Sequence, residues 1–169
     1  MPVKTTKELF VMLLSDLRQG TQKAANIYQE IGQLAQDPEV KEALEARAFI
    51  SDKVLATLDR CFNIIGETPV ALSGHLEEVF AEDLRKELAE IKTQEARRLF
   101  ALAKLNYLAH LRIGQYEALI VAATLAGHHG VSLLLQTCLA DKLVYVKRTR
   151  NLIRNVVETK VAERKAASA

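Results

Sequence analysis

The sequence contains no tryptophan, three prolines, seven glycines and two cysteines among its 169 residues. With so few prolines and glycines, long stretches of the chain carry no residue that breaks a helix. The remaining composition is rich in Ala, Leu, Lys, Glu and Arg, which lose little side-chain freedom in a helix. A glycine-rich phosphate loop, a nucleophile elbow and zinc-type Cys/His spacing are all missing from the sequence. We therefore predict an all-α protein that is not an enzyme.

The formal net charge is only +2, which is too small to indicate a nucleic-acid-binding protein by itself. No apolar run reaches the length of a transmembrane helix, because Lys104, His110, Arg112 and Glu117 interrupt the most apolar stretch, 99–127. The N-terminus opens into an amphipathic segment and lacks the apolar run of a signal peptide. We expect a soluble, cytoplasmic protein with a single domain over 1–169.

Apolar residues recur at helical spacing in four long stretches and one shorter one. Thr5 and Glu8 form a capping-box pattern before the first stretch, Pro38 opens the second, and Gly66 ends it. The predicted helices are 6–36, 38–65, 73–89, 92–126 and 130–164. Two short breaks make two antiparallel hairpins, and a long acidic crossover containing the short helix joins them. This order is that of a ferritin-like four-helix bundle.

Several segments of the chain carry a more specific resemblance. They are residues 7–10 (KELF), 13–16 (LLSD), 110–116 (HLRIGQY) with Leu119, and 134–139 (LLQTCL). Through them the whole chain resembles the YciE/YciF-like family of ferritin-like bacterial proteins, whose members are usually discussed in connection with stress responses. The resemblance implies a ferritin-like bundle and a homodimer formed through helical faces.

The same resemblance implies where a di-metal site would lie, with carboxylates and histidines that point inward from four helices. In this chain those positions hold Thr21, Phe49, Asp52, Ala109 or Arg112 (depending on register), and the run Ala140, Asp141 and Lys142. Only Asp52, His110 and Asp141 could still coordinate an ion, and they cannot supply bridging carboxylates. We predict a degenerate site with no metal and no cofactor. The alternative is a residual metal protein that uses these three side chains, with Glu117 nearby.

The isolated histidines and cysteines have simple structural interpretations. We expect His110 to be a hydrogen-bonded core histidine, and His128 and His129 to lie in a solvated turn. Cys61 and Cys138 are interpreted as reduced core thiols at different heights of the bundle, too far apart for a disulfide. A redox pair is the alternative.

Two surface features indicate interactions. Small residues at every fourth position, Gly114, Ala118, Ala122 and Ala126, form a stripe that suits either a close internal helix crossing or a contact between subunits. The last helix is basic, with Lys142, Lys147, Arg148, Arg150, Arg154, Lys160, Arg164 and Lys165. We interpret this basic face as a solvated surface that complements the acidic crossover. Binding of nucleic acid or another acidic partner is the alternative.

The favoured function is a non-catalytic ferritin-like protein that acts as a scaffold, through self-association or an unidentified protein partner. A stress-related role follows from the resemblance only. We expect a homodimer, and neither a membrane nor nucleic acid as the partner. The residual metal protein and the anion-binding basic helix remain as alternatives from other functional classes.

Overall fold

The computed structural model describes residues 3–35 and 38–167. Fourteen side chains within the helices also lie outside the described part. They include Phe49, Lys160, Arg164 and Lys165, on which the sequence analysis relied, and Glu39, Glu42 and Glu45 of the second helix. Throughout the described residues the chain forms helices and loops and contains no β-strand.

The helices agree closely with the predicted ones. They are α1 (Thr6–Ala35), α2 (Pro38–Ile65), α3 (His75–Glu90), α4 (Gln94–Leu125) and α5 (His129–Ala167). The capping box at the start of α1 is formed as predicted. The Thr5 hydroxyl accepts the Glu8 N–H at 3.1 Å, and the Glu8 carboxylate accepts the Thr5 N–H at 3.1 Å. Gly66 and Gly127 have φ of 67° and 76°, the left-handed conformation that ends α2 and α4.

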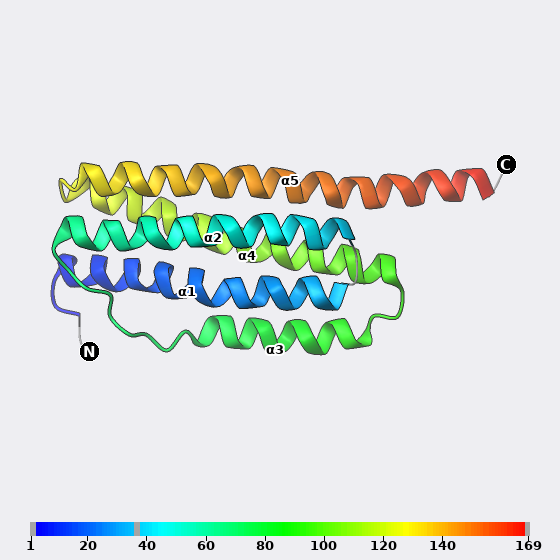
Figure 1. Ribbon diagram of the computed structural model, residues 1–169, viewed down its shortest axis with the longest axis horizontal. Coiled ribbons are helices and arrows are strands. Elements are labelled where there is room, and N and C mark those ends of the chain that lie inside the picture. The colour runs from blue at the N-terminus through cyan, green and yellow to red at the C-terminus, as the bar shows by residue number, and fades with distance from the viewer. Residues whose placement is uncertain (1–2, 36–37, 168–169) are drawn as a thin grey trace.

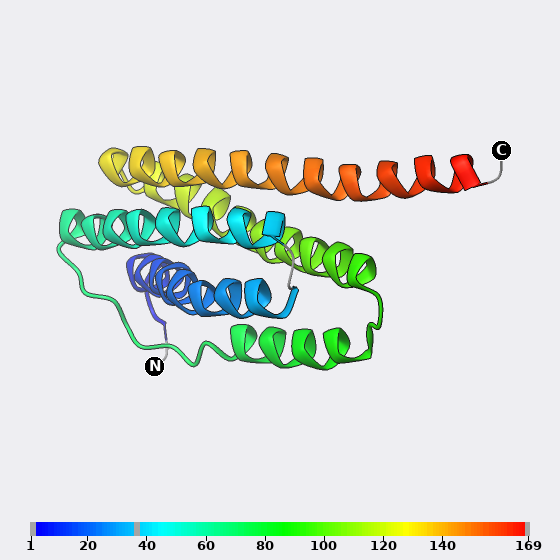
Figure 2. The ribbon, with the colours of Figure 1, turned by 45° about the vertical axis from the view of Figure 1, so that its right-hand side comes forward.

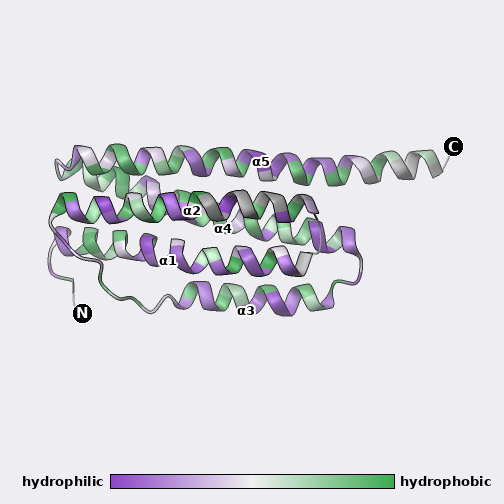
Figure 3. Ribbon diagram, in the orientation of Figure 1, coloured by the Kyte–Doolittle hydropathy of each residue, from purple (hydrophilic) through white to green (hydrophobic). Residues whose placement is uncertain are grey.

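Four of the helices form the bundle, with α1 against α2 and α4, and α5 against α2 and α4. Figures 1 and 2 show that each of these neighbours is antiparallel, and that the crossover with α3 returns the chain along the full length of the bundle. The predicted arrangement of two antiparallel hairpins joined by a long crossover is therefore confirmed. Hydrophobic and hydrophilic turns alternate along α1 in Figure 3, as expected for an amphipathic helix that lies on a core.

The apolar core is divided into two main clusters along the bundle axis. One contains Leu14, Leu58, Leu119 and Leu135. The other contains Ile31, Leu44, Leu84, Leu88 and Leu102. In each bundle helix the residues of one cluster precede those of the other along the chain, so the two clusters occupy opposite ends of the bundle. The residues between them lie midway along the axis, where a ferritin-like bundle would carry its site.

The acidic crossover helix does not lie beside the basic last helix, contrary to the interpretation of the basic face. Helix α3 packs on α1 and α4, and Figure 1 shows it on the side of the bundle away from α5. Its acids instead meet bases of α1 and α4, as in the pairs Lys23–Glu78 and Lys104–Glu87. The described acids of α3 therefore do not complement the basic face of α5 in the way that the sequence predicted.

Helix α5 extends well beyond the rest of the bundle, as Figure 1 shows. Val157 and Val161, in the C-terminal part of α5, are exposed. An isolated helix of this length is only marginally stable in water, and apolar side chains on it favour a covering partner. None of the helices within the described residues is long and apolar enough to cross a membrane.

Candidate functional site

The middle of the bundle contains buried polar side chains beside a small apolar cluster of α4 and α5, which includes Ile113 and Val146. We call Thr21, Arg47, Ser51, Arg112 and Lys142 the polar layer; they come from α1, α2, α4 and α5 and lie between the two apolar clusters. Arg47 and Arg112 are each 1% exposed, and Lys142 is 3% exposed. Burying a charge costs free energy unless that charge is paired, so each base in this layer requires a specific environment.

Arg112 is neutralised from outside the four-helix bundle. Its guanidinium forms an ion pair with Glu77 at the start of α3, and both side chains are almost completely buried. The same guanidinium donates to the Gln115 side-chain oxygen at 2.6 Å, and Gln115 donates to Asp16 of α1 at 2.5 Å. This chain of contacts ties α3 and α1 to the centre of α4. Charge-assisted hydrogen bonds of this kind are the strong ones in proteins.

Arg112 fits in the bundle only because α1 has a glycine opposite it. A Cβ atom at Gly20 would collide with the Arg112 guanidinium. Gly20 lies in the middle of a helix, where glycine is ordinarily unfavourable by about 0.5–1 kcal/mol relative to alanine. The close approach of Arg112 explains why glycine stands here.

Arg47 has a different environment, made of aromatic rings. Its guanidinium carbon lies 4.9 Å from the ring centre of Tyr145 and 5.5 Å from that of Tyr28. Cation–π contacts of this kind stabilise a buried cation in part. Yet the Nε and Nη1 atoms of Arg47 have no hydrogen-bond acceptor in the described part of the protein, and no described carboxylate forms an ion pair with it.

Three buried tyrosines lie around the Arg47 guanidinium. The hydroxyl groups of Tyr28, Tyr116 and Tyr145 make no hydrogen bond of normal geometry among the described residues, although the Tyr116 hydroxyl lies near Cys138 and the Tyr145 hydroxyl near Thr149. Burial raises the pKa of Tyr116 and of Tyr145 above the usual value for a phenol. These two hydroxyls therefore stay protonated at neutral pH and remain available as donors.

The helix register of α2 and α5 differs from the one assumed for the metal positions. Asp52 is exposed, and the inward side chains at that height of α2 are Arg47 and Ser51. On α5, Ala140 is exposed while Lys142 points inward. The assignment of the α2 metal position to Asp52, and the inward placement of Ala140, are therefore wrong. The expectation for Phe49 falls outside the described side chains.

On α1 and α4 the predicted inward positions are correct. Thr21, Ala109 and Arg112 are all buried, and none of them is a good ligand for a divalent metal. The Thr21 hydroxyl donates to the Leu17 carbonyl at 2.7 Å within its own helix. In the described part of the middle layer the inward side chains are bases, hydroxyls and small residues. Among the described residues, the four bundle helices contribute no inward carboxylate to this layer.

The candidate remnant ligands do not converge. His110 is exposed, with Nδ1 2.8 Å from the Asn106 carbonyl oxygen, so its placement in the core is corrected to a surface histidine. Asp141 is half-buried and lies 3.7 Å from the Lys53 ammonium. Among the described residues no three His, Cys, Asp or Glu side chains form a group that could hold a metal ion.

Comparison with known proteins shows to which family this chain is related. The model of the family described as Domain of unknown function (DUF892) matches residues 5–164. The chain belongs to this family. Because the match covers nearly the whole sequence, the predicted YciE/YciF-like membership of this DUF892 protein is confirmed. No curated protein matches the sequence.

Three solved structures share the fold of this DUF892 protein. The stress protein YciF of E. coli is 17% identical with a TM-score of 0.87, over 92% of this chain and 99% of YciF. YcfI of Rhodopseudomonas palustris is 18% identical with a TM-score of 0.83, over 88% and 94% of the two chains. A protein of Xanthomonas campestris is 16% identical with a TM-score of 0.71, over 95% and 99%. At such low identity they show the fold alone, which is the predicted ferritin-like bundle.

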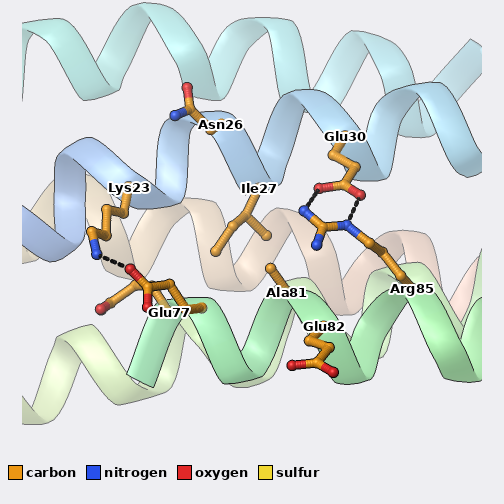
Figure 4. Close-up of a pocket in the computed structure, with 9 residues that line it drawn as sticks. Lys23, Asn26, Ile27, Glu30, Glu77, Ala81, Glu82 and Arg85 are labelled. Carbon is orange, nitrogen blue, oxygen red and sulfur yellow. Dashed lines mark hydrogen bonds and ion pairs between the residues drawn. The ribbon is translucent and has the colours of Figure 1, made fainter. Parts of the chain in front are cut away.

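A groove of about 410 Å³ lies between α1 and α3 of this DUF892 protein (Figure 4). Its charged side chains pair with one another or with neighbours. Lys23 binds Glu78 at 2.7 Å, and Arg85 binds Glu30 through Nη2 and Oε2 at 2.8 Å. Glu77, which also lines the groove, is held by Arg112. The ion pairs across the groove therefore hold α3 against α1. The described contacts identify no ligand for the groove.

The small-residue stripe of α4 faces outward. Gly114, Ala118 and Ala126 are exposed, Ala122 is half-buried, and a Cβ at Gly114 would meet nothing within 4 Å. The internal helix crossing considered for this stripe is therefore wrong, and a contact between subunits remains a proposal. The basic side chains Lys147, Arg148, Arg150 and Arg154 are exposed on α5.

Both cysteines of this DUF892 protein are free and buried in the same apolar cluster. Burial, with a smaller contribution from Cys138, raises the pKa of Cys61 to about 12. Burial also raises the pKa of Cys138, and the Asp141 charge adds to the effect. We expect that at pH 8 neither thiol reacts with a disulfide reagent faster than the protein unfolds, because the thiolate is the reactive form. Spectrophotometric thiol titration in buffer and in denaturant tests this; a rapid reaction in the folded state would contradict it.

The residues that the sequence analysis missed are Arg47, Glu77 and Gly20. Arg47 stands on the inward stripe of α2 with Leu44, Ser51 and Val54, at helical spacing. That spacing was visible in the sequence. Glu77 and Gly20 gave no comparable signal, because their roles depend on a contact with Arg112.

Proposed function

We propose that this protein is a non-catalytic, cytoplasmic scaffold that acts as a homodimer, with the ancestral type of metal centre lost. The main support is the exposed apolar surface of the α4–α5 hairpin. Leu125 is 84% exposed and Val144 is 70% exposed. Val121, Leu133 and Leu143 are exposed as well. Large apolar side chains gathered on an exposed helix face often mark an interaction site.

The position of the small residues also favours a helix-to-helix contact. Gly114, Ala118, Val121 and Leu125 succeed one another at spacings of three or four residues, so they share the exposed face of α4. Small residues there let a second helix approach closely, and the larger ones flank it with apolar area. We take this face as the dimer contact. YciF is described as a stress protein, and we extend a stress-related role to this chain as part of the same proposal.

The dimer is tested by sedimentation velocity. We expect the wild-type protein to sediment as a dimer, and the double variant Val121→Glu/Leu125→Glu to sediment as a monomer, because two charges would be buried in the contact. Leu76→Glu/Val79→Glu, on the exposed face of α3, is the matched control and should remain dimeric. A monomeric wild-type protein, or equal dissociation of both variants, would overturn the proposal.

Metal content separates this proposal from the residual metal protein. Elemental mass spectrometry on untagged protein, before and after incubation with ferrous iron under argon, should show far less than one metal per chain. One tightly held ion lost on His110→Ala would favour the residual site instead. Near two irons per chain would contradict the donor set described for the polar layer.

The exposed basic side chains of α5 favour a second candidate, the binding of nucleic acid or another polyanion. It predicts steeply salt-dependent DNA affinity that disappears when Arg148, Arg150 and Arg154 become Glu. Absence of binding at low salt would eliminate this candidate. The scaffold proposal predicts that absence.

A further inference from the structure

We propose that the polar layer binds a small inorganic anion, held by Arg47 and the surrounding tyrosine hydroxyls. The site lies midway along the bundle, enclosed by helices α1, α2, α4 and α5, and the two apolar clusters cover it on both sides. The proposal does not depend on dimer formation or on the absence of catalysis.

The charge balance of the buried residues is the first reason. Within the described part of the chain three bases are buried, Arg47, Arg112 and Lys142, against a single buried acid, Glu77. Glu77 is already paired with Arg112. A guanidinium stays protonated at any pH at which the protein folds. Arg47 therefore keeps its positive charge in a water-excluded environment without a described counter-charge.

The described inward faces of the helices around Arg47 offer no acid. Its aromatic neighbours are Tyr28 on α1 and Tyr145 on α5. The other buried polar side chains of the layer include the hydroxyls of Thr21 and Ser51, and each donates to a carbonyl of its own helix. Cation–π contact offsets only part of the cost of burying a charge. A bound anion supplies the negative charge that these side chains do not provide.

The hydrogen-bonding groups are the second reason. Nε and Nη1 of Arg47 and Nε of Arg112 are donors without an acceptor among the described residues. The hydroxyls of Tyr28, Tyr116 and Tyr145 are also buried and make no hydrogen bond of normal geometry there. The charges of both Arg47 and Arg112 act on the Tyr116 hydroxyl, which places the two arginines and this tyrosine in one electrostatic neighbourhood. Buried donors are almost always satisfied in folded proteins.

The ligand chemistry follows from these two observations. A set of donors with excess positive charge is complementary to a negative group that only accepts hydrogen bonds. Divalent cations are excluded by the same charges. Bound water could accept some of these hydrogen bonds, but it would leave the Arg47 charge uncompensated. Chloride and inorganic phosphate are small anions of this kind.

The test measures the urea midpoint, the concentration at which half of the 169-residue protein is unfolded, at constant ionic strength. Chloride and inorganic phosphate are the two probes, each titrated against a large organic anion as the balancing salt. We expect one of them to raise the midpoint in a saturable manner, because a ligand that binds only the folded state stabilises it. Direct binding is then measured by ³⁵Cl line broadening or by equilibrium dialysis of phosphate, which also distinguishes the two ions.

Variants connect the binding to the proposed residues. Arg47→Met should abolish the saturable shift and make the midpoint independent of the anion. Tyr145→Phe keeps the ring and removes one donor, so it should weaken affinity by about tenfold, the loss of one hydrogen bond to a charged group. Arg85→Met is the control, since it removes an exposed arginine that pairs with Glu30 and should leave the shift unchanged.

Each outcome decides the proposal. A saturable shift in wild type and in Arg85→Met, but not in Arg47→Met, supports it. If Arg47→Met does not fold, the tenfold change in Tyr145→Phe serves the same purpose. If neither anion binds wild-type protein, or if Tyr145→Phe and Arg85→Met behave identically, the polar layer is satisfied by water or by repacking and the proposal is wrong.

Discussion

Replacing Glu77 by alanine should destabilise the protein by about 3–5 kcal/mol, the range for removing one partner of a buried ion pair. The substitution leaves Arg112, which is 1% exposed, without the carboxylate that neutralises it. The guanidinium would keep its hydrogen bond to the Gln115 side chain, which is neutral. Urea unfolding followed by circular dichroism measures the loss, and hydrogen exchange should show α3 opening first because Glu77 fastens its first turn to α4.

The neighbouring residue supplies the matched control. Glu78 also forms an ion pair, with Lys23 at 2.7 Å, but its side chain is 63% exposed. Exposed pairs contribute about 0–1 kcal/mol, so Glu78→Ala should have little effect. The double variant Glu77→Leu/Arg112→Met should recover most of the stability lost in Glu77→Ala, because neither charge of the buried pair remains. Equal losses of unfolding free energy in Glu77→Ala and Glu78→Ala would show that the buried pair stabilises the protein no more than the exposed pair does.

The elements of this fold were predictable because each helix carries local information. The capping box of Thr5 and Glu8, the proline at 38 and the glycines at 66 and 127 mark helix ends through backbone chemistry that needs no tertiary contact. Two short breaks and one long crossover then leave few arrangements of four helices. The positions of Thr21, Ala109 and Arg112 came from the family resemblance, and all three are buried on α1 and α4.

The centre of the bundle was less predictable because it departs from the usual pattern of apolar residues inside. Arg47 occupies a core position on α2, and a basic residue in a helix is ordinarily assigned to the surface. Assigning the inward position of α2 by resemblance rather than by periodicity placed it at Asp52, which is exposed. On α5, the same procedure gave the run Ala140, Asp141 and Lys142, of which only Lys142 is buried. On α2 the inward base, Arg47, was overlooked.

The location of α3 could not be read from its own composition. Its acids complement bases on α5 and bases on α1 and α4 equally well in sequence. Geometry decides between them, since a crossover from the end of α2 to the start of α4 runs beside α1 and α4 in this bundle. Glu77 contacts Arg112 only once α3 has packed on the bundle. The ion pair therefore could not be predicted from the local sequence.

Gly20→Ala provides the second large effect, because it acts on the same ion pair from the opposite side. The added methyl group would occupy the space of the Arg112 guanidinium, which the contact with Glu77 prevents from moving away freely. Overpacking of this type costs about 1–3 kcal/mol, although alanine is intrinsically better than glycine in a helix. Gly130→Ala, in α5 and outside the proposed dimer contact, is the control, since nothing lies within 4 Å of the position that its added methyl group would take, and it should be neutral or slightly stabilising.

A double-mutant cycle identifies the cause of the Gly20 effect. In an Arg112→Met background the guanidinium is gone, so Gly20→Ala should become neutral or stabilising, and the coupling energy should equal most of the single-variant cost. Thermal or urea unfolding of the four proteins measures it. If Gly20→Ala is equally harmful with and without the arginine, the glycine is required by backbone packing between α1 and its neighbours. A large coupling instead means that Gly20, Arg112 and Glu77 act as one unit that fastens the crossover helix to the interior of the bundle.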